Sequence, residues 1–245
     1  MTDVKGESKK GVVEGIFVGK SVDLAKADLD NPERRGQYFV EWRVTDESIA
    51  KGITNLQGSI RAIDSGAQML QSCAVDNMHI TMNQLVLSDV KQVQKAIEVI
   101  RKFEEEDFRK LVPSNASVKM EVGSNLSHFK QRVLFAPVSN DQTAFKGDIL
   151  VECFNRLQKR LVAAGFKPSA RPLKPHLTVA KAAGKRFSDE MFPEIMKLGG
   201  GEESLGTQWL RELVFCVKRT KREKTPPVLY RCCMGPPPSS SSSSS

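Results

Sequence analysis

Histidine is scarce in this sequence, and long runs of apolar residues are absent from it. Only three of the 245 residues are histidine, so any histidine chemistry depends on very few positions. Nowhere do eighteen apolar residues follow one another, which argues against a membrane-spanning helix. The first residues, MTDVKGESKKG, lack the apolar stretch of a secretory signal. We therefore expect a protein of the cell interior, in the cytoplasm, the nucleus or both.

Paired cysteines and metal-ligand clusters are also missing. The five cysteines are an odd number, and none forms a C-x-x-C pair or lies near histidines at ligand spacing. We expect neither disulfides nor zinc, and no cofactor. The cysteines are Cys73, Cys153, Cys216, Cys232 and Cys233.

The composition is that of a globular protein with an excess of basic residues. Hydrophobic residues make up 40% of the chain and charged residues 27%, which is ordinary for a folded domain. The formal net charge is +8, which favours a polyanionic partner such as nucleic acid. Charge alone is only a hint, because many basic proteins bind no nucleic acid.

The chain divides into three parts. Residues 1–35 are rich in Lys, Asp, Glu and Gly and form an N-terminal segment that either holds a strand or is loosely attached. Residues 36–234 carry alternating strand and helix patterns and form the domain. Residues 235–245 are a Pro/Ser tail that cannot bury enough surface to fold, so we expect it to be disordered.

Strand and helix patterns alternate through the domain, and the pattern restarts halfway along it. We expect strands near residues 37–44, 78–87, 117–122, 132–138, 175–181, 209–218 and 228–233. We expect helices near residues 46–62, 88–108, 143–164 and 188–198. This order predicts an α+β protein with two pseudo-symmetric lobes of antiparallel or mixed sheet and flanking helices around a central cleft.

Two of the three histidines lie in matching segments, Met78-His79-Ile80-Thr81-Met82 and Pro175-His176-Leu177-Thr178-Val179. In a strand, residues two apart share a face, so each histidine projects together with its threonine. If the lobes are related by an approximate twofold axis, the segments meet across a groove. Two imidazoles and two hydroxyls then face one phosphate.

That set of groups suits cleavage of a phosphodiester by a neighbouring ribose hydroxyl. The reaction needs a base to take the hydroxyl proton and an acid to protonate the leaving oxygen. Imidazole can do either near neutral pH. Threonine hydroxyls can donate to phosphate oxygens in the transition state, and no metal is required.

The alternative for each histidine is a buried, hydrogen-bonded core residue, which is the usual state of a histidine flanked by apolar residues in a strand. Two copies of His-aliphatic-Thr, one in each half, favour function instead. His128, in Ser127-His128-Phe129, has no such partner, and we expect it in a surface loop.

The paired H-x-T segments resemble the 2H phosphoesterase superfamily, which is named for its two histidines. YFVEWRVTDESIAKGITNLQ, the MHIT strand, VGSNLSHFKQRVLFAPV and KPHLTVAK together resemble its 2′-5′ RNA ligase-like branch, the central domain of A-kinase anchor protein 7. The resemblance implies a bilobal α+β fold and metal-independent cleavage of 2′-5′-linked oligoadenylate, or of related 2′,3′-cyclic and RNA phosphodiester bonds. By motif position it makes His79 and His176 catalytic and assigns phosphate binding to Thr81 and Thr178.

Two further site residues follow from the resemblance. Lys181 lies where relatives often carry a basic residue, yet its odd spacing from His176 turns it away in a regular strand unless a bulge intervenes. The alternative for Lys181 is a solvated lysine. Phe129 matches an aromatic position that could stack on a base, although such a residue is more often core.

The ligands implied are 2′-5′ oligoadenylate, RNA ends or AMP-like nucleotides. The alternatives to an enzyme are a catalytically weak AMP- or RNA-binding module and a scaffold. Kinase anchoring is not supported, because no extra amphipathic helix follows the domain, and we expect a monomer. The basic run over residues 218–224 is either an import signal, a nucleic-acid patch or, as we expect, a solvated hairpin loop.

Overall fold

The computed structural model describes most of the domain and parts of the N-terminal segment. The described residues are 20–21, 28–29, 34, 36–65, 67–68, 77–112, 118–140, 147–169, 171–182, 186–199, 204–210, 212–220 and 222–233. The expected disordered tail lies outside these residues. None of the helices within them combines the length and the apolar character that crossing a membrane demands.

The first lobe is a five-stranded antiparallel sheet that joins strands from both ends of the domain. Its strand order is β1-β11-β10-β2-β4. The strands are β1 (Lys20–Ser21), β2 (Gln37–Arg43), β4 (His79–Val86), β10 (Glu212–Val217) and β11 (Val228–Cys233). β1 comes from the N-terminal segment and pairs with β11. The first histidine strand, β4, therefore lies at the edge of this sheet.

The second lobe is also an antiparallel sheet, with the order β3-β8-β7-β5-β9 and with β6 paired to β7. Its strands are β3 (Ala67–Gln68), β5 (Lys119–Val122), β6 (Ser127–Phe129), β7 (Val133–Asn140), β8 (His176–Ala182) and β9 (Gly206–Trp209). The second histidine strand, β8, lies next to β7. Two antiparallel sheets with flanking helices confirm the predicted α+β class.

The three longest helices begin where the sequence supplies an aspartate cap. Asp46, Asp89 and Asp148 each accept hydrogen bonds from backbone N–H groups in the first turn of the helix that follows. The helices are α1 (Glu47–Ile63), α2 (Val90–Lys102), α3 (Arg109–Leu111), α4 (Ile149–Ala163) and α5 (Phe192–Lys197). A π-helical turn, η5 (Phe103–Phe108), joins α2 to α3, so the helix expected over 88–108 continues to Leu111.

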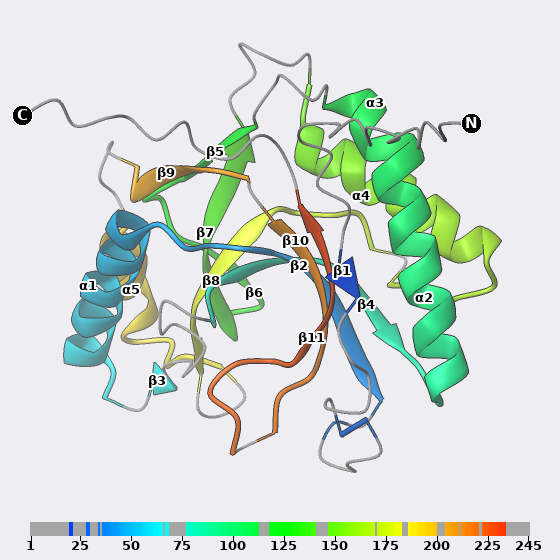
Figure 1. The fold of residues 1–245 in the computed structure, drawn as a ribbon. Helices are drawn as coiled ribbons and strands as arrows, with labels where there is room; N and C mark the ends of the chain where they lie inside the picture. The colour runs from blue at the N-terminus through cyan, green and yellow to red at the C-terminus, as the bar shows by residue number, and fades with distance from the viewer. Residues whose placement is uncertain are drawn as a thin grey trace, which may run out of the picture.

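The helices that precede the two histidine strands cross between the lobes. α1 follows β2 of the first sheet but packs against β8 and β9 of the second sheet and beside α5. α4 follows β7 of the second sheet and stays in contact with it, but it also packs beside α2 and contacts β4 of the first sheet. Figure 1 shows α1 with α5 on one side of the sheets and α2, α3 and α4 on the other. Each histidine strand is thus held by the helix that precedes the other one.

One strand begins later than expected, and one expectation about a loop is wrong. The strand expected over 209–218 is β10 and begins only at Glu212, because Trp209 is the last residue of a separate strand, β9, and the chain passes from the second lobe to the first between them. The residue pattern alone does not reveal this change of sheet. His128 lies in the short strand β6 and not in a loop, although its side chain is exposed.

Candidate active site

The first histidine is oriented by the backbone that leads into β4. His79 Nδ1 lies 2.8 Å from the carbonyl oxygen of Asn77. Because a carbonyl oxygen only accepts, Nδ1 carries the hydrogen of this bond, and Nε2 is the nitrogen left for acid–base chemistry. His79 and Thr81 are half-buried, whereas Ile80 between them is fully buried. This confirms the expected projection of the histidine and its threonine from one face.

The second histidine repeats this geometry. His176 Nδ1 lies 2.7 Å from the carbonyl oxygen of Lys174, again two residues before the histidine. His176 and Thr178 are both half-buried, and Leu177 between them is buried. Two strands from different sheets therefore present the same pair of groups with the same ring nitrogen engaged.

Both pairs open into one cleft between the lobes, with a volume of about 450 Å³. The structure brings all six predicted site residues together on its walls: His79, Thr81, Phe129, His176, Thr178 and Lys181. Other lining residues include Phe39, Glu41, Asn77, Gln84, Lys218, Arg219 and Pro226. Among the described residues, no group of three or more His, Cys, Asp or Glu has the arrangement of a metal site.

A β-bulge explains how Lys181 reaches this cleft despite its odd spacing. In the β7–β8 ladder Phe135 pairs with Thr178 and Leu134 with Ala180, so Val179 is the extra residue. An extra residue shifts the alternation by one and returns Lys181 to the face of His176. Gln57 of α1 donates a hydrogen bond of 2.9 Å to the carbonyl oxygen of Val179 and so holds the bulge in place.

β4 carries a bulge at the matching position. In the β2–β4 ladder Glu41 pairs with Thr81 and Val40 with Asn83, so Met82 is the extra residue. Gln84, five residues after His79, thereby lines the cleft as Lys181 does five residues after His176. Sequence reasoning missed Gln84, although its offset from His79 equals that of Lys181 from His176.

Glu41 is the second residue that sequence reasoning missed. Its buried side chain lies opposite Thr81, and Oε2 is 3.6 Å from Nε2 of His79. The guanidinium of Arg43 lies 3.1 Å from Oε1, and the thiol of Cys216 donates a hydrogen bond to the carboxylate. Burial raises the pKa of Cys216 well above its ordinary value, so the thiol keeps its proton. His79 thus has an anionic neighbour.

His176 has aromatic and cationic neighbours instead. The ring centroids of Phe129 and Phe135 each lie 5.0 Å from that of His176. Lys174 Nζ lies 5.5 Å from the ring centroid of Phe135. Burial lowers the pKa of His176 below its ordinary value, and the charges of His79, Lys174 and Lys181 lower it further, against the raising effect of the bond to Lys174. His176 therefore favours the neutral form.

Phe129 offers a stacking surface at the cleft. One side of its ring stacks on Phe135 at a centroid distance of 4.4 Å, while 37% of the residue is exposed. Phe129 therefore packs on the core with one side of its ring and leaves part of its surface exposed. His128, its neighbour in β6, packs edge-on against Phe192 at 4.9 Å and does not line the cleft.

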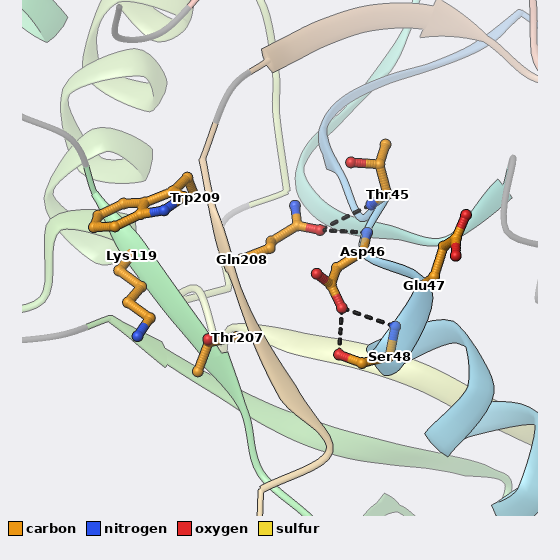
Figure 2. Close-up of a pocket in the computed structure, with 8 residues that line it drawn as sticks. All are labelled: Thr45, Asp46, Glu47, Ser48, Lys119, Thr207, Gln208 and Trp209. Atoms are coloured by element: carbon orange, nitrogen blue, oxygen red, sulfur yellow. Dashed lines mark hydrogen bonds between the residues drawn. The ribbon is translucent and has the colours of Figure 1, made fainter. Parts of the chain in front are cut away.

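A second hollow, of about 600 Å³, lies at the joint between the lobes and carries no such chemistry. Figure 2 shows Gln208 of β9 at its centre, bonded through its side-chain oxygen to the backbone nitrogens of Thr45 and Asp46. The amide nitrogen of Gln208 donates to the carbonyl oxygen of Arg43. These bonds tie β9 of the second lobe to the end of β2, the strand that carries Glu41.

Comparisons with known proteins agree with this fold. The family model of the AKAP7 2′5′ RNA ligase-like domain matches residues 37–234. The crystal structure of E. coli LigT with 3′-AMP is similar to the chain at a TM-score of 0.54 and 14% identity, covering 81% of this chain and 98% of that one. The structure of E. coli LigT with NADP⁺ is similar at a TM-score of 0.53 and 14% identity, covering 82% of this chain and 99% of that one. The crystal structure of a phosphoesterase is similar at a TM-score of 0.50 and 13% identity, and it also covers 82% of this chain and 99% of that one.

Among curated protein sequences, none matches the chain significantly. The family model nevertheless spans nearly the whole described domain, including both histidine strands. The chain therefore belongs to the AKAP7 2′5′ RNA ligase-like family.

Proposed function

We propose that the protein is a metal-independent phosphodiesterase that cleaves 2′-5′-linked oligoadenylate, or related 2′,3′-cyclic and RNA phosphodiester bonds. Membership of the phosphoesterase superfamily supports a phosphodiesterase-type activity. One observation carries the proposal: two imidazoles with the same nitrogen engaged face a common cleft beside two threonines. The similarity to LigT, whose structure holds 3′-AMP, supports a nucleotide as the ligand.

The different neighbours of the two histidines favour a division of labour. His176, whose pKa is lowered, is suited to act as the base that takes the proton of the attacking ribose hydroxyl. His79 has the carboxylate of Glu41 as a counter-ion when its imidazole holds the proton, so it is suited to act as the acid. The charge of a protonated His79 opposes a second charge on His176, which favours a single proton on the pair.

In this mechanism the 3′-hydroxyl next to a 2′-5′ linkage attacks phosphorus. Nε2 of His176 takes the hydroxyl proton, the new P–O3′ bond forms, and the P–O5′ bond breaks as His79 protonates the leaving O5′. The products are a 2′,3′-cyclic phosphate and a free 5′-hydroxyl. Thr81, Thr178 and Lys181 donate to the non-bridging oxygens as their charge grows. Phe129 stacks on a base.

The test is incubation of purified protein with 2′-5′ diadenylate, 3′-5′ diadenylate and 2′,3′-cyclic AMP, each with and without excess chelator. We expect turnover of at least one of these substrates, and we expect the chelator to leave the rate unchanged. Complete loss of activity in chelator, restored by a divalent ion, would overturn the mechanism. Binding without turnover of any substrate would favour the nucleotide-binding alternative.

A further inference from the structure

The loop between β10 and β11 forms one wall of the cleft and supplies two of its cations. Lys218 and Arg219 line the cleft together with Pro226. Lys218 and Arg219 begin the basic run that we expected to be a solvated hairpin loop. Exposed charges of such a loop would point into solvent, whereas Lys218 and Arg219 are half-buried. The position of these two cations therefore needs an explanation.

The loop is fixed by hydrogen bonds at several points. The backbone N–H of Lys218 donates to the carbonyl oxygen of Gln37 at 2.8 Å, and the Lys218 carbonyl oxygen accepts from Arg34 at 2.7 Å. Glu223 accepts from Arg34 at 2.6 Å and from the backbone N–H of Thr220 at 2.7 Å. The Asn77 side chain donates to the Lys224 carbonyl oxygen at 2.7 Å. These hydrogen bonds hold the loop in one position beside the cleft.

Arg34 is the centre of this support. It is only 2% exposed, it bonds both to Lys218 and to Glu223, and it lies before the first residue matched by the family model. Burial alone would raise the pKa of Glu223, but the hydrogen bonds from Arg34 and Thr220 outweigh it, and the pKa is lowered. The carboxylate therefore stays charged and keeps Arg34 in place.

Lys218 and His79 lie at opposite ends of the stretch of β2 that borders the cleft. Lys218 is bonded to Gln37, whereas Arg43, six residues further along β2, lies opposite His79. At about 3.3 Å per residue this is roughly 20 Å of strand, which long side chains shorten but do not close. Lys218 therefore lies at a distance from the imidazole of His79, and we place another part of the ligand beside it.

We infer that Lys218 and Arg219 form a second phosphate-binding subsite, so that the preferred ligands carry a phosphate besides the one that reacts. The inference rests on the proposed function, because it places the first phosphate at the histidines. The second phosphate is either a 5′-phosphate on a bound nucleoside or the next linkage of an oligonucleotide. Arg219 also donates to the Glu223 carbonyl oxygen at 3.2 Å, which orients its guanidinium. Arg34 is a positioning residue for both cations.

The first experiment measures the affinities of 3′-AMP and adenosine 3′,5′-bisphosphate for the full-length protein by calorimetry. We expect the bisphosphate to bind roughly tenfold or more tightly, as charge-assisted hydrogen bonds allow. In Lys218→Ala/Arg219→Ala this preference should disappear while 3′-AMP binds nearly as before. The matched control is Arg222→Ala/Lys224→Ala, which removes the same charge from exposed positions of the same loop.

The second arm identifies the source of the phosphate. It compares KM for 2′-5′ diadenylate and 2′-5′ triadenylate, both without a 5′-phosphate, in the wild type and in Lys218→Ala/Arg219→Ala. A selective rise in KM for the trimer assigns the subsite to the next linkage, and a selective loss of bisphosphate affinity assigns it to a 5′-phosphate. An effect on neither, or an equal effect of the exposed control pair, overturns the subsite.

The role of Arg34 has its own readout. Arg34→Gln should lower the preference for whichever of the two phosphates the subsite takes, although it removes no charge from the cleft wall, and Arg34→Lys should restore part of it. Failure of 3′-AMP to bind the wild type counts against the proposed function instead. The subsite is judged separately, on whether binding of the second phosphate depends on Lys218 and Arg219.

Discussion

The two histidine strands share their backbone geometry and differ in what the neighbouring strand supplies. β2 places Glu41 opposite Thr81, whereas β7 places Phe135 opposite Thr178. Five residues after the histidine, β4 presents Gln84 and β8 presents Lys181. The comparison teaches that a repeated motif aligns two equal groups, and that the residues around it make them unequal. Acid–base catalysis needs that inequality, because one imidazole must give a proton while the other takes one.

The largest effect should come from removing either imidazole. His79→Ala and His176→Ala should each lower kcat by roughly 10²–10⁴-fold, and the double variant should be scarcely slower, because both groups act in one step. Steady-state kinetics on a 2′-5′ dinucleotide checks this, alongside thermal melting to establish folding. His128→Ala is the control and should retain turnover. Near-normal activity in a folded single variant would make that histidine structural.

A smaller effect should come from the hydroxyls. Thr81→Val and Thr178→Val should each lower kcat by roughly 10–10³-fold, because each removes one donor to the transition state. The measurement is kcat under saturating substrate, and the comparison between the two variants tells whether both lobes contribute equally. Unchanged kinetics in both would mean that the hydroxyls do not bind the reacting phosphate.

Lys181→Gln would make the second half-site resemble the first. Loss of a charge-assisted hydrogen bond to phosphate should lower kcat/KM by roughly 10–100-fold. Gln84→Ala is the matched variant on β4 and should cost less, since an amide carries no charge. If Lys181→Gln and Gln84→Ala behave alike, the charge of Lys181 contributes nothing.

The smallest expected effect is on the pH dependence of the rate, which distinguishes the base from the acid most directly. His176 must be neutral to act as the base, and its pKa is lowered, so the acid limb of kcat/KM should have its midpoint below about 6.5, the ordinary value for histidine. Glu41→Gln removes the carboxylate that lies 3.6 Å from Nε2 of His79, and should lower kcat while leaving this acid limb in place. Glu121→Gln, an exposed carboxylate in β5, is the control. Movement of the acid limb instead would reverse the assignment.

The sequence predicted the parts of this site that depend on local pattern. The alternation around His79 and His176 correctly gave strands with the histidine and threonine on one face. The bulges at Met82 and Val179 were not predictable, because an extra residue is defined by the partner strand and not by the strand that contains it. For the same reason Glu41 had no signal: only the pairing of β2 with β4 brings it to His79.

The position of the β10–β11 loop could not be predicted from its charged residues either. A dense basic run favours a solvated loop when it is considered alone. Its actual position depends on Arg34, which lies 184 residues before Lys218 in the chain. A pattern of charged residues predicts the sign of the surface charge well. It does not predict which distant buried residue, here Arg34 paired with Glu223, will hold the loop against the cleft.

The crossed packing of α1 and α4 has a consequence for how the molecule unfolds. Each helix leaves one sheet and covers part of the other, and β2 pairs with β10 from the opposite end of the domain. Neither lobe can lose its structure while the other keeps its helix in place, so the lobes form one cooperative unit and melting should be a single transition. Because most of the defining contacts join distant parts of the chain, assembly from the unfolded state should be slow for a protein of this size.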